Sequence, residues 1–348
     1  MSAAEPGTEP FSDAELDSLF SDLEHCRRVL LAVSGGPDST ALLQLAHRWR
    51  KGRRAGPALV AVTVDHRLRP DSKREAANVG KLAKPLGIEH HILAWTGRKP
   101  SRGLQEAARD ARYGLLFALA EKVGADAIAT AHTLDDQGET FLMRLARGSG
   151  IAGLGSIRRV TARNGVSIVR PFLTVPKSRL LEMLRKARVP YAKDSSNTDS
   201  KFLRSRLRKL NADLANEGLV PERLALAAHR LARADDAIES IVDEVQPGIA
   251  GGVWPNASPI DISAGAFFRV PDEIAIRLLA RAINQVGDEG PAELGKLEML
   301  FEAMKAARGT GETLRRTLAG ALVDLDAGRV RVTRAPERAK KKGRSRSA

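Results

Sequence analysis

The sequence predicts an α/β fold with a parallel sheet, followed by a mainly helical C-terminal region. Between residues 29 and 147, short apolar runs alternate with amphipathic segments of helical length. This alternation is typical of a parallel sheet that is covered by helices on both faces. A glycine-bearing loop follows the first apolar run directly, and helical patterns dominate after residue 170.

The first half of the chain carries the strand signals. Ser12 and Glu15 have the spacing of a capping box, which predicts a helix over residues 13–24. Residues 29–33 are apolar and β-branched, as expected of a buried parallel strand. Further strands are expected over residues 59–64, 90–94 and 127–131. Helices are expected over residues 38–49, 73–86, 104–123 and 136–147.

The second half is mostly helical. Helical patterns cover residues 179–187 and much of 203–245. Residues 246–259 are rich in Gly and Pro, which indicates a linker. Two more helices, over 271–285 and 293–307, and short strands near the end are expected of a smaller domain.

Composition indicates a polyanionic partner and excludes some chemistry. The chain of 348 residues has a formal net charge of +14, and lysine and arginine in excess gain affinity for nucleic acid through counterion release. The single cysteine, Cys26, excludes an internal disulfide and any CxxC pair for a metal or for sulfur transfer. The N-terminus lacks a signal-peptide pattern and no apolar run is long enough to span a bilayer, so we expect a cytoplasmic protein without a membrane partner.

The loop Ser34-Gly35-Gly36-Pro37-Asp38-Ser39 has the composition of a phosphate cradle. Its glycines allow positive φ and a close approach of phosphate, and its serines supply hydroxyl donors. The N-terminus of the following helix adds positive potential. The loop lacks the GxxxxGK[ST] pattern of a Walker A motif, which points away from cleavage between the β- and γ-phosphates.

This loop resembles the SGGxDS pyrophosphate loop of the N-type ATP pyrophosphatases, the PP-loop superfamily, which has a Rossmann-like fold. The resemblance implies that ATP is a substrate, that Mg²⁺ is required, and that AMP and pyrophosphate are released. It implies ATP contacts from all six loop residues, Ser34, Gly35, Gly36, Pro37, Asp38 and Ser39. Asp38 would lie near the metal.

Five further blocks, in the same order, resemble those of the tRNA(Ile)-lysidine synthetases. They are VDHRLRPDS at 64–72, ARDARY at 108–113, TAHTLDDQGET at 130–140 with RGSG at 147–150, RPFL at 170–173, and DSSN at 194–197 with the arginines that follow it. The resemblance covers residues 27–208. It implies that the wobble cytidine of a CAU anticodon attacks the α-phosphate of ATP, and that the ε-amine of free L-lysine then displaces AMP. Lysidine would form at carbon 2 of the base, and codon reading would change from AUG to AUA.

Residue spacing within these blocks suggests an amino-acid site. Arg109 and Arg112 lie three residues apart on one helix face, as do Asp136 and Glu139. Such pairs also occur on solvated helix faces and in ordinary ion pairs. With the resemblance, a lysine site of Arg112, Asp136 and Glu139 is the better interpretation, because a carboxylate needs an arginine and an ammonium needs acids.

The other expected site residues follow from the matched blocks. His132 follows the strand at 127–131, where ligands of parallel sheets bind. Catalytic roles are expected for Asp38, His132 and Asp136. Val64 and His66 are expected to contact ATP, and Arg147, Arg170, Arg204, Arg206 and Arg208 to contact tRNA.

The sequence departs from the family pattern in two places. Ser205 stands where the pattern usually has Asn, and the chain ends before the extra C-terminal domain of longer members.

The sequence leaves two alternative functions open. A tRNA thiolase would share the ATP domain but normally needs a pair of cysteines. A non-catalytic RNA-binding protein would not need the intact loop. An ATP–pyrophosphate assay would separate these alternatives.

The expected organisation has six segments. They are an N-terminal helical extension (1–26), the PP-loop domain (27–210), a helical connector (211–245), a linker (246–259), a small C-terminal α/β domain that binds tRNA (260–337) and a disordered basic tail (338–348). The sequence leaves the oligomeric state open, with a homodimer among the options.

Overall fold

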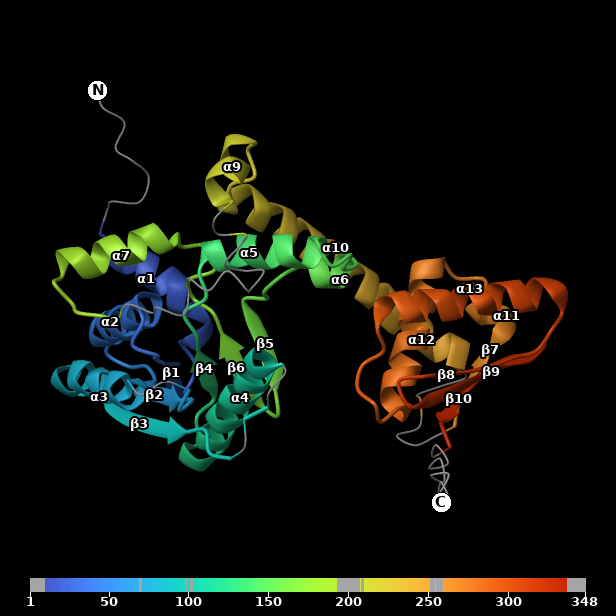
Figure 1. Ribbon diagram of the computed structural model, residues 1–348, viewed down its shortest axis with the longest axis horizontal. Coiled ribbons are helices and arrows are strands. Elements are labelled where there is room, and N and C mark those ends of the chain that lie inside the picture. The colour runs from blue at the N-terminus through green and yellow to red at the C-terminus, as the bar shows by residue number, and fades with distance from the viewer. Residues whose placement is uncertain are drawn as a thin grey trace, which may run out of the picture. The chain divides into compact units, whose positions relative to one another are not determined.

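The chain forms two compact units. The computed structural model describes residues 10–68, 71–97, 99–100, 103–192, 207, 210–250, 254 and 259–336. One unit consists of residues 1–148 and 154–230, and the other of residues 149–153 and 231–348. Figure 1 shows the sheet of each unit with its helices. No helix among the described residues is both long enough and apolar enough to cross a membrane.

The first unit is built on a six-stranded sheet with the order β3-β2-β1-β4-β6-β5. Its strands are β1 (Arg28–Ala32), β2 (Ala58–Asp65), β3 (Glu89–Ala94), β4 (Ala127–Ala129), β5 (Val160–Arg163) and β6 (Val166–Val169). Neighbouring strands from β3 to β6 are parallel, and β5 is antiparallel to β6. The predicted parallel sheet is therefore confirmed.

The β5–β6 hairpin was not expected. Its strands are four residues each, and β5 is largely exposed, so neither forms an apolar run. The turn between them is Asn164-Gly165, and both residues have positive φ, at 51° and 76°. An Asn-Gly pair of this kind is the preferred two-residue hairpin turn, so this pair was the signal in the sequence.

Helices cover both faces of this sheet, as predicted. The described helices up to residue 250 are α1 (Asp13–Phe20), α2 (Pro37–Lys51), α3 (Ser72–Ala83), α4 (Leu104–Val123), α5 (Leu134–Leu145), α6 (Ile151–Leu154), α7 (Lys177–Lys186), α9 (Asn211–Asn216) and α10 (Pro221–Ala250), with single turns η1 (Ser21–Leu23) and η2 (Lys84–Leu86). Most of α6 and most of α10 belong to the second unit. One core joins α1, α2, α3 and α7 to Val29 and Leu31 of β1. A second core joins α4 to Leu30. Successive residues of β1 thus point to opposite, covered faces.

The helix expected over 136–147 begins two residues earlier. Thr133 caps α5: its hydroxyl accepts from the backbone N–H of Asp136, and the Asp136 carboxylate accepts from the backbone N–H of Thr133 at 2.8 Å. This reciprocal capping box satisfies donors that the first turn of a helix leaves open. Asp136 therefore has a structural role at the start of α5.

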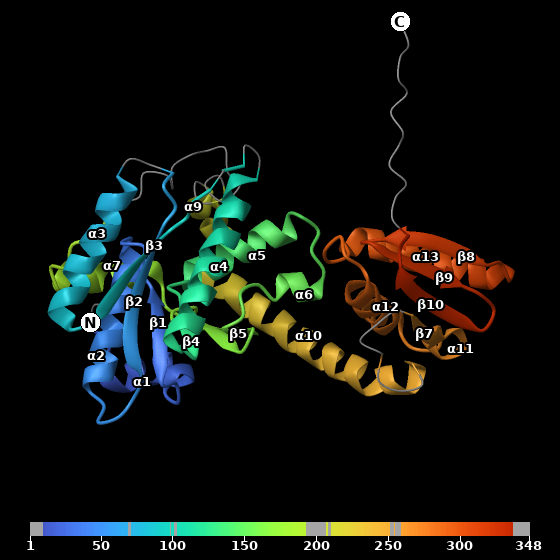
Figure 2. The same cartoon turned by 90° about the horizontal axis from the view of Figure 1, so that it is seen from below.

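The second unit contains an antiparallel sheet with the order β7-β10-β9-β8. Its elements are β7 (Ile260–Ser263), α11 (Ala264–Phe267), α12 (Asp272–Val286), α13 (Leu294–Thr310), β8 (Leu314–Leu318), β9 (Ala321–Leu325) and β10 (Arg329–Arg334). Figure 2 shows α12 and α13 beside these strands. Alternate residues of β10, Val330 and Val332, are fully buried in a core shared with both helices.

The opposite face of this sheet carries alternating charge. The register places Arg331 of β10 between Asp261 of β7 and Asp324 of β9, and it places Asp324 opposite Arg315 of β8. Arg331 pairs with Asp261 at 2.7 Å and Arg315 with Asp324 at 3.3 Å. Arg316 is also exposed on β8, which is an edge strand.

Helix α10 runs through Pro247 and ends at Ala250, so it occupies the first residues of the expected linker 246–259. Val242 and Ile249 on either side of the proline are buried in the core of the second unit. This packing outweighs the hydrogen bond that proline removes from the helix.

A buried arginine joins α12 to the part of α10 in the second unit. Arg277 is only 9% exposed. Its guanidinium donates to Asp235 at 2.7 Å, to Glu239 at 2.6 Å and to Glu273 at 2.8 Å. These carboxylates raise the pKa of Arg277 despite its burial. Arg281, one turn along α12, also pairs with Glu239. These charge-assisted hydrogen bonds therefore link the two helices in addition to the apolar core that they share.

Replacing Arg277 with Met should destabilise the second unit by about 3–5 kcal/mol, because the buried carboxylate of Asp235 would lose its ion pair with the guanidinium. Hydrogen exchange of the β9 and β10 amides measures this free energy separately from the first unit. The matched control is Arg331→Met, which breaks an exposed pair and should cost far less. Equal losses in the two variants would contradict this assignment.

Candidate active site

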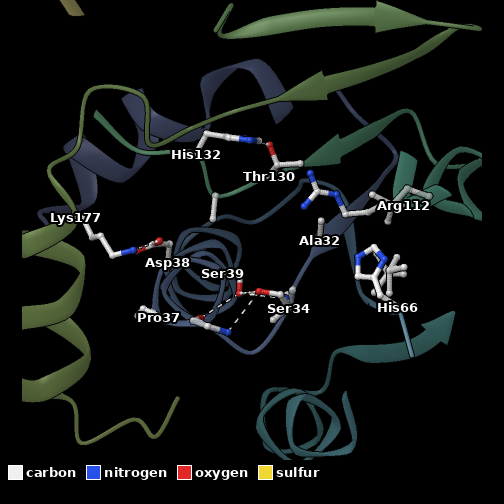
Figure 3. A pocket seen from close by; sticks show the side chains of 16 residues that line it. Ala32, Ser34, Pro37, Asp38, Ser39, His66, Arg112, Thr130, His132 and Lys177 are labelled. Atoms are coloured by element: carbon white, nitrogen blue, oxygen red, sulfur yellow. Dashed lines mark hydrogen bonds and ion pairs between the residues drawn. The ribbon is translucent and has the colours of Figure 1, made fainter. Parts of the chain in front are cut away.

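The loop between β1 and α2 is organised by its two serines. The backbone N–H of Ser34 donates to Ser39 Oγ at 3.1 Å, and Ser39 Oγ donates to the carbonyl of Gly36 at the same distance. The two hydroxyl oxygens also lie 3.1 Å apart. Helix α2 begins directly behind them at Pro37, with Gly36 as its N-cap residue. The loop therefore directs hydroxyls and a helix N-terminus toward one space (Figure 3).

Gly35 is the residue in this loop whose conformation requires glycine. Its φ is +88°, and a Cβ atom here would lie 3.3 Å from Val79 on α3. Its carbonyl accepts hydrogen bonds from Thr40 Oγ1 at 3.3 Å and from the backbone N–H of Ala192 at 2.8 Å. The loop is thus held from α2, from α3 and from the segment after α7.

A cavity of about 270 Å³ lies at the carboxyl ends of β1, β2 and β4. It brings together most of the expected ATP and catalytic residues, namely Ser34, Gly36, Pro37, Asp38, Ser39, Val64, His66 and His132, with Arg112 of the expected lysine site. Gly35 instead lines a separate cavity of about 320 Å³ with α3 and residues 190–192. The position of the first cavity agrees with the rule for parallel sheets, in which ligands bind beyond the carboxyl ends of the strands.

Lys177 is a cavity residue that the sequence analysis missed. Its Nζ pairs with Asp38 Oδ2 at 2.7 Å, and its backbone N–H donates to Asp135 at 2.8 Å (Figure 3). Burial raises the pKa of Asp38, the ion pair with Lys177 opposes that rise, and the nearby Asp136 reinforces it. Lys177 is the first residue of α7 and belongs to no recognisable motif. Its contact with Asp38 could therefore not be predicted from the spacing of residues in the sequence.

His132 is held close to the end of β4. Its Nδ1 lies 2.9 Å from Thr130 Oγ1. Burial lowers the pKa of His132 to about 4; Asp136 opposes this shift, and Arg170 and Arg112 add to it. The imidazole is therefore neutral near pH 7, which suits hydrogen bonding better than proton acceptance.

His66 and Arg112 line the far side of the cavity from Lys177 (Figure 3). The His66 ring packs edge-on against Trp95, with centroids 6.0 Å apart. Burial lowers the pKa of His66, and the charge of Arg112 adds to this effect. Val64 and Leu116 provide apolar surface nearby, so this side of the cavity is suited to a flat, uncharged group.

The three expected lysine-binding residues do not share one cavity. Arg112 lines the cavity described above, whereas the buried Glu139 lines another of about 300 Å³. Asp135 contributes a second carboxylate to that cavity, and its walls include Leu142 and Leu219. Asp136 belongs to the capping box of α5, and it lines neither of the two cavities.

The expected tRNA-binding arginines have different surroundings. Arg147 is exposed. Arg170 is only 6% exposed and donates to the carbonyl of Arg158 at 2.8 Å and to Thr161 Oγ1 at 3.2 Å. A buried guanidinium with such partners stabilises the β5–β6 region, which argues against the tRNA contact that we expected. Arg204, Arg206 and Arg208 lie outside the described residues.

Comparisons with known proteins agree with this site. A family model described as a PP-loop domain matches residues 9–214. A tRNA(Ile)-lysidine synthase from Bradyrhizobium diazoefficiens is 45% identical, with 95% of this chain and 96% of the relative covered. Another, from Rhodopseudomonas palustris, is 47% identical, with 95% and 97% covered. The chain belongs to the tRNA(Ile)-lysidine synthase family. ATP is accordingly a substrate of the PP-loop domain.

One solved structure is similar in fold to this member of the lysidine synthase family, although the two sequences share little identity. It is a U34-tRNA thiolase, NcsA, from Methanococcus maripaludis with its [4Fe–4S] cluster. The TM-score is 0.55 with 19% identity, over 64% of this chain and 78% of that one. The likeness concerns the fold alone, and the lysidine synthase chain has one cysteine, the half-buried Cys26.

In this lysidine synthase family member, Lys177→Met should raise the pKa of Asp38 further, because the substitution removes the charge that opposes burial. The carboxyl would then become protonated at a higher pH as acid is added. Carboxyl ¹³C NMR, without nucleotide or Mg²⁺, measures the midpoint. Lys186→Met is the control, since Lys186 pairs with Glu182 at the other end of α7. An Asp38 midpoint that both variants leave unchanged would show that Lys177 does not act on this carboxyl.

Proposed function

We propose that this chain ligates lysine to carbon 2 of the wobble cytidine in the CAU anticodon of tRNA(Ile), through an adenylated tRNA intermediate. The observation that carries the proposal is an SGGPDS loop that lines one cavity with His132 and Arg112 through all its residues but Gly35, in a chain that shares 45–48% identity with lysidine synthases along nearly its whole length. ATP is consumed in the first step and AMP leaves in the second.

The first step places the phosphates of ATP over the loop. Ser34 and Ser39 offer hydroxyls and α2 offers its N-terminus. The adenine would lie on the side of Val64 and His66, where the wall is apolar. The cytidine O2 then attacks the α-phosphorus, the bond to the bridging oxygen breaks, and pyrophosphate leaves. Catalysis comes from positioning and from charge stabilisation.

Asp38 is suited to contact Mg²⁺. Its Oδ1 is buried and accepts no hydrogen bond from the described residues, and carboxylate oxygen is a preferred ligand of this ion. The described residues contain no cluster of three metal-ligating side chains, so the remaining ligands would be phosphate oxygens and water. Bound Mg²⁺ would offset charge on the phosphates. Lys177 then has the reach to turn its Nζ from Asp38 to a phosphate oxygen.

The second step requires recognition of lysine and removal of an amine proton. We assign the lysine carboxylate to Arg112 and an ammonium group to the acids of α5, Asp136 and Glu139. The cavity of Glu139 joins buried carboxylate to apolar wall, which suits a cation on an alkyl chain. Asp136, close enough to His132 to influence its pKa, is the residue we assign to hold the proton of the ε-amine.

Binding of tRNA rests on the basic character of the chain, with its net charge of +14. We retain the exposed Arg147 as a contact, together with Arg204, Arg206 and Arg208. We do not assign a tRNA contact to Arg170, because its side chain is buried. The segment over 260–336 supplies a second unit with exposed arginines for the same partner.

The function is tested by incubating the chain with unmodified tRNA(Ile), ATP and L-lysine. Mass spectrometry of the digested anticodon should show lysidine at the wobble position. The yield should depend on ATP, with one AMP and one pyrophosphate released for each lysidine formed. Asp38→Ala, which removes the loop carboxylate, is the inactive control. Pyrophosphate release without any modified cytidine would reject the proposal.

Glu139→Gln should separate the two steps. The variant keeps the shape of the side chain and removes a buried charge. A charge-assisted hydrogen bond contributes roughly 1.5–3 kcal/mol, so the apparent affinity for lysine should fall by about tenfold to a hundredfold. Adenylated tRNA, measured without lysine, should still form and then react slowly when lysine is added.

The matched control for Glu139 is Glu121→Gln, on the exposed C-terminal turn of α4. It should change neither step. If Glu139→Gln blocks adenylation and leaves the dependence on lysine concentration intact, the carboxylate belongs to the ATP step and our assignment is wrong.

A further inference from the structure

A buried hydroxyl contacts the catalytic imidazole. Thr130 is only 7% exposed, and its Oγ1 lies 2.9 Å from Nδ1 of His132. Both side chains line the 270 Å³ cavity, and Figure 3 shows the two groups directed at each other. The distance is that of a good hydrogen bond, in which either atom can be the donor.

The backbone on both sides of this pair is fixed. The N–H of Thr130 donates to the carbonyl of Val169 on β6 at 2.9 Å. Thr133 begins the capping box of α5, and the N–H of Leu134 donates to the carbonyl of Val175 at 3.1 Å. His132 therefore lies on a short span anchored at each end, so its ring orientation depends mainly on what its side chain contacts.

The hydroxyl proton of Thr130 determines the direction of the bond. Among the residues that the structure describes, His132 is the hydrogen-bond partner of Thr130 Oγ1. A buried hydroxyl that did not donate to Nδ1 would leave its proton without an acceptor there, at a cost in free energy. Donation from Oγ1 to Nδ1 avoids this cost. It makes Nδ1 the acceptor and leaves Nε2–H as the donor of the ring.

We propose that Thr130 is a positioning residue that holds His132 in the Nε2–H tautomer, so that the neutral ring donates a hydrogen bond to a phosphate oxygen in the cavity. The inference rests on the proposed function for its substrate, and it adds a role for a residue outside the loop and the carboxylates. Negative charge that develops on the phosphate during adenylation would strengthen this bond, which is how a fixed donor lowers a barrier.

The surrounding charges support a donor role over a basic one. Arg109, Arg112 and Arg170 all disfavour a positive charge on His132, whereas Asp136 favours it. A neutral imidazole with Nε2–H presents a donor to an anion without taking up a proton. The proton of the lysine amine is then left to Asp136, in agreement with the second step proposed above.

The experiment compares the full chain with Thr130→Val, which keeps the shape and removes the hydroxyl, and Thr130→Ser, which restores it. The ¹⁵N shifts of His132 in labelled protein report the tautomer without any substrate. Single-turnover formation of AMP-linked tRNA, without lysine, reports the rate. We expect Nε2–H in the natural protein and a mixture of tautomers in Thr130→Val. The rate constant should fall about tenfold in that variant and recover in Thr130→Ser, while KM for ATP stays within about twofold.

A second pair of variants identifies the route of the effect. In a His132→Gln background, Thr130→Val should cause no further loss, because the residue acts through the ring. Additive losses, a full rate in Thr130→Val, or an Nδ1–H tautomer in the natural protein would each overturn the proposal. The last result does not depend on whether Thr130→Val folds. If the natural protein forms no adenylated tRNA, the proposed function itself fails and the bond between Thr130 and His132 is structural.

Discussion

The turn at Gly35 and Gly36 is the constraint on which the rest of the first unit depends. It joins a strand and a helix that both contribute to the core, and its φ of +88° beside α3 favours a residue without Cβ. The Gly35 carbonyl also receives the N–H of Ala192, which ties the segment after α7 to the same turn. Three parts of the chain that are distant in sequence, namely α2, α3 and the segment after α7, thereby meet at this turn.

The cavity at the carboxyl ends of β1, β2 and β4 carries charges of both signs. Helices α2, α5 and α7 all begin near the cavity, at Pro37, Leu134 and Lys177. Their N-termini favour anions, yet Asp38 lies among them and is compensated by Lys177. The ion pair thus offsets the charge of the carboxylate on α2 with a cation at the start of α7.

The sequence predicts the first four strands well because each is a short apolar run between clear helical patterns. It misses β5 because this strand is largely exposed and β6 because only its last two residues are buried, although Asn164-Gly165 marks the turn. It also ends the helix α10 early at Pro247, where burial of Ile249 outweighs the effect of proline. Within the site, motif matching finds the loop and His132 but not Lys177, whose importance comes only from tertiary proximity to Asp38. Arg170 is the opposite case: it lies in a matched motif, but its side chain is buried and donates to a backbone carbonyl.

The arginine-bearing edge strand β8 has a consequence for the behaviour of the whole chain in solution. An open strand edge offers unpaired N–H and C=O groups to any other strand, and many chains aggregate by this route. Arg315 and Arg316 are exposed on β8. A second molecule that approached with the same edge would have to bring these like charges together and strip water from them. These arginines therefore oppose the pairing of β8 with the same edge of a second molecule.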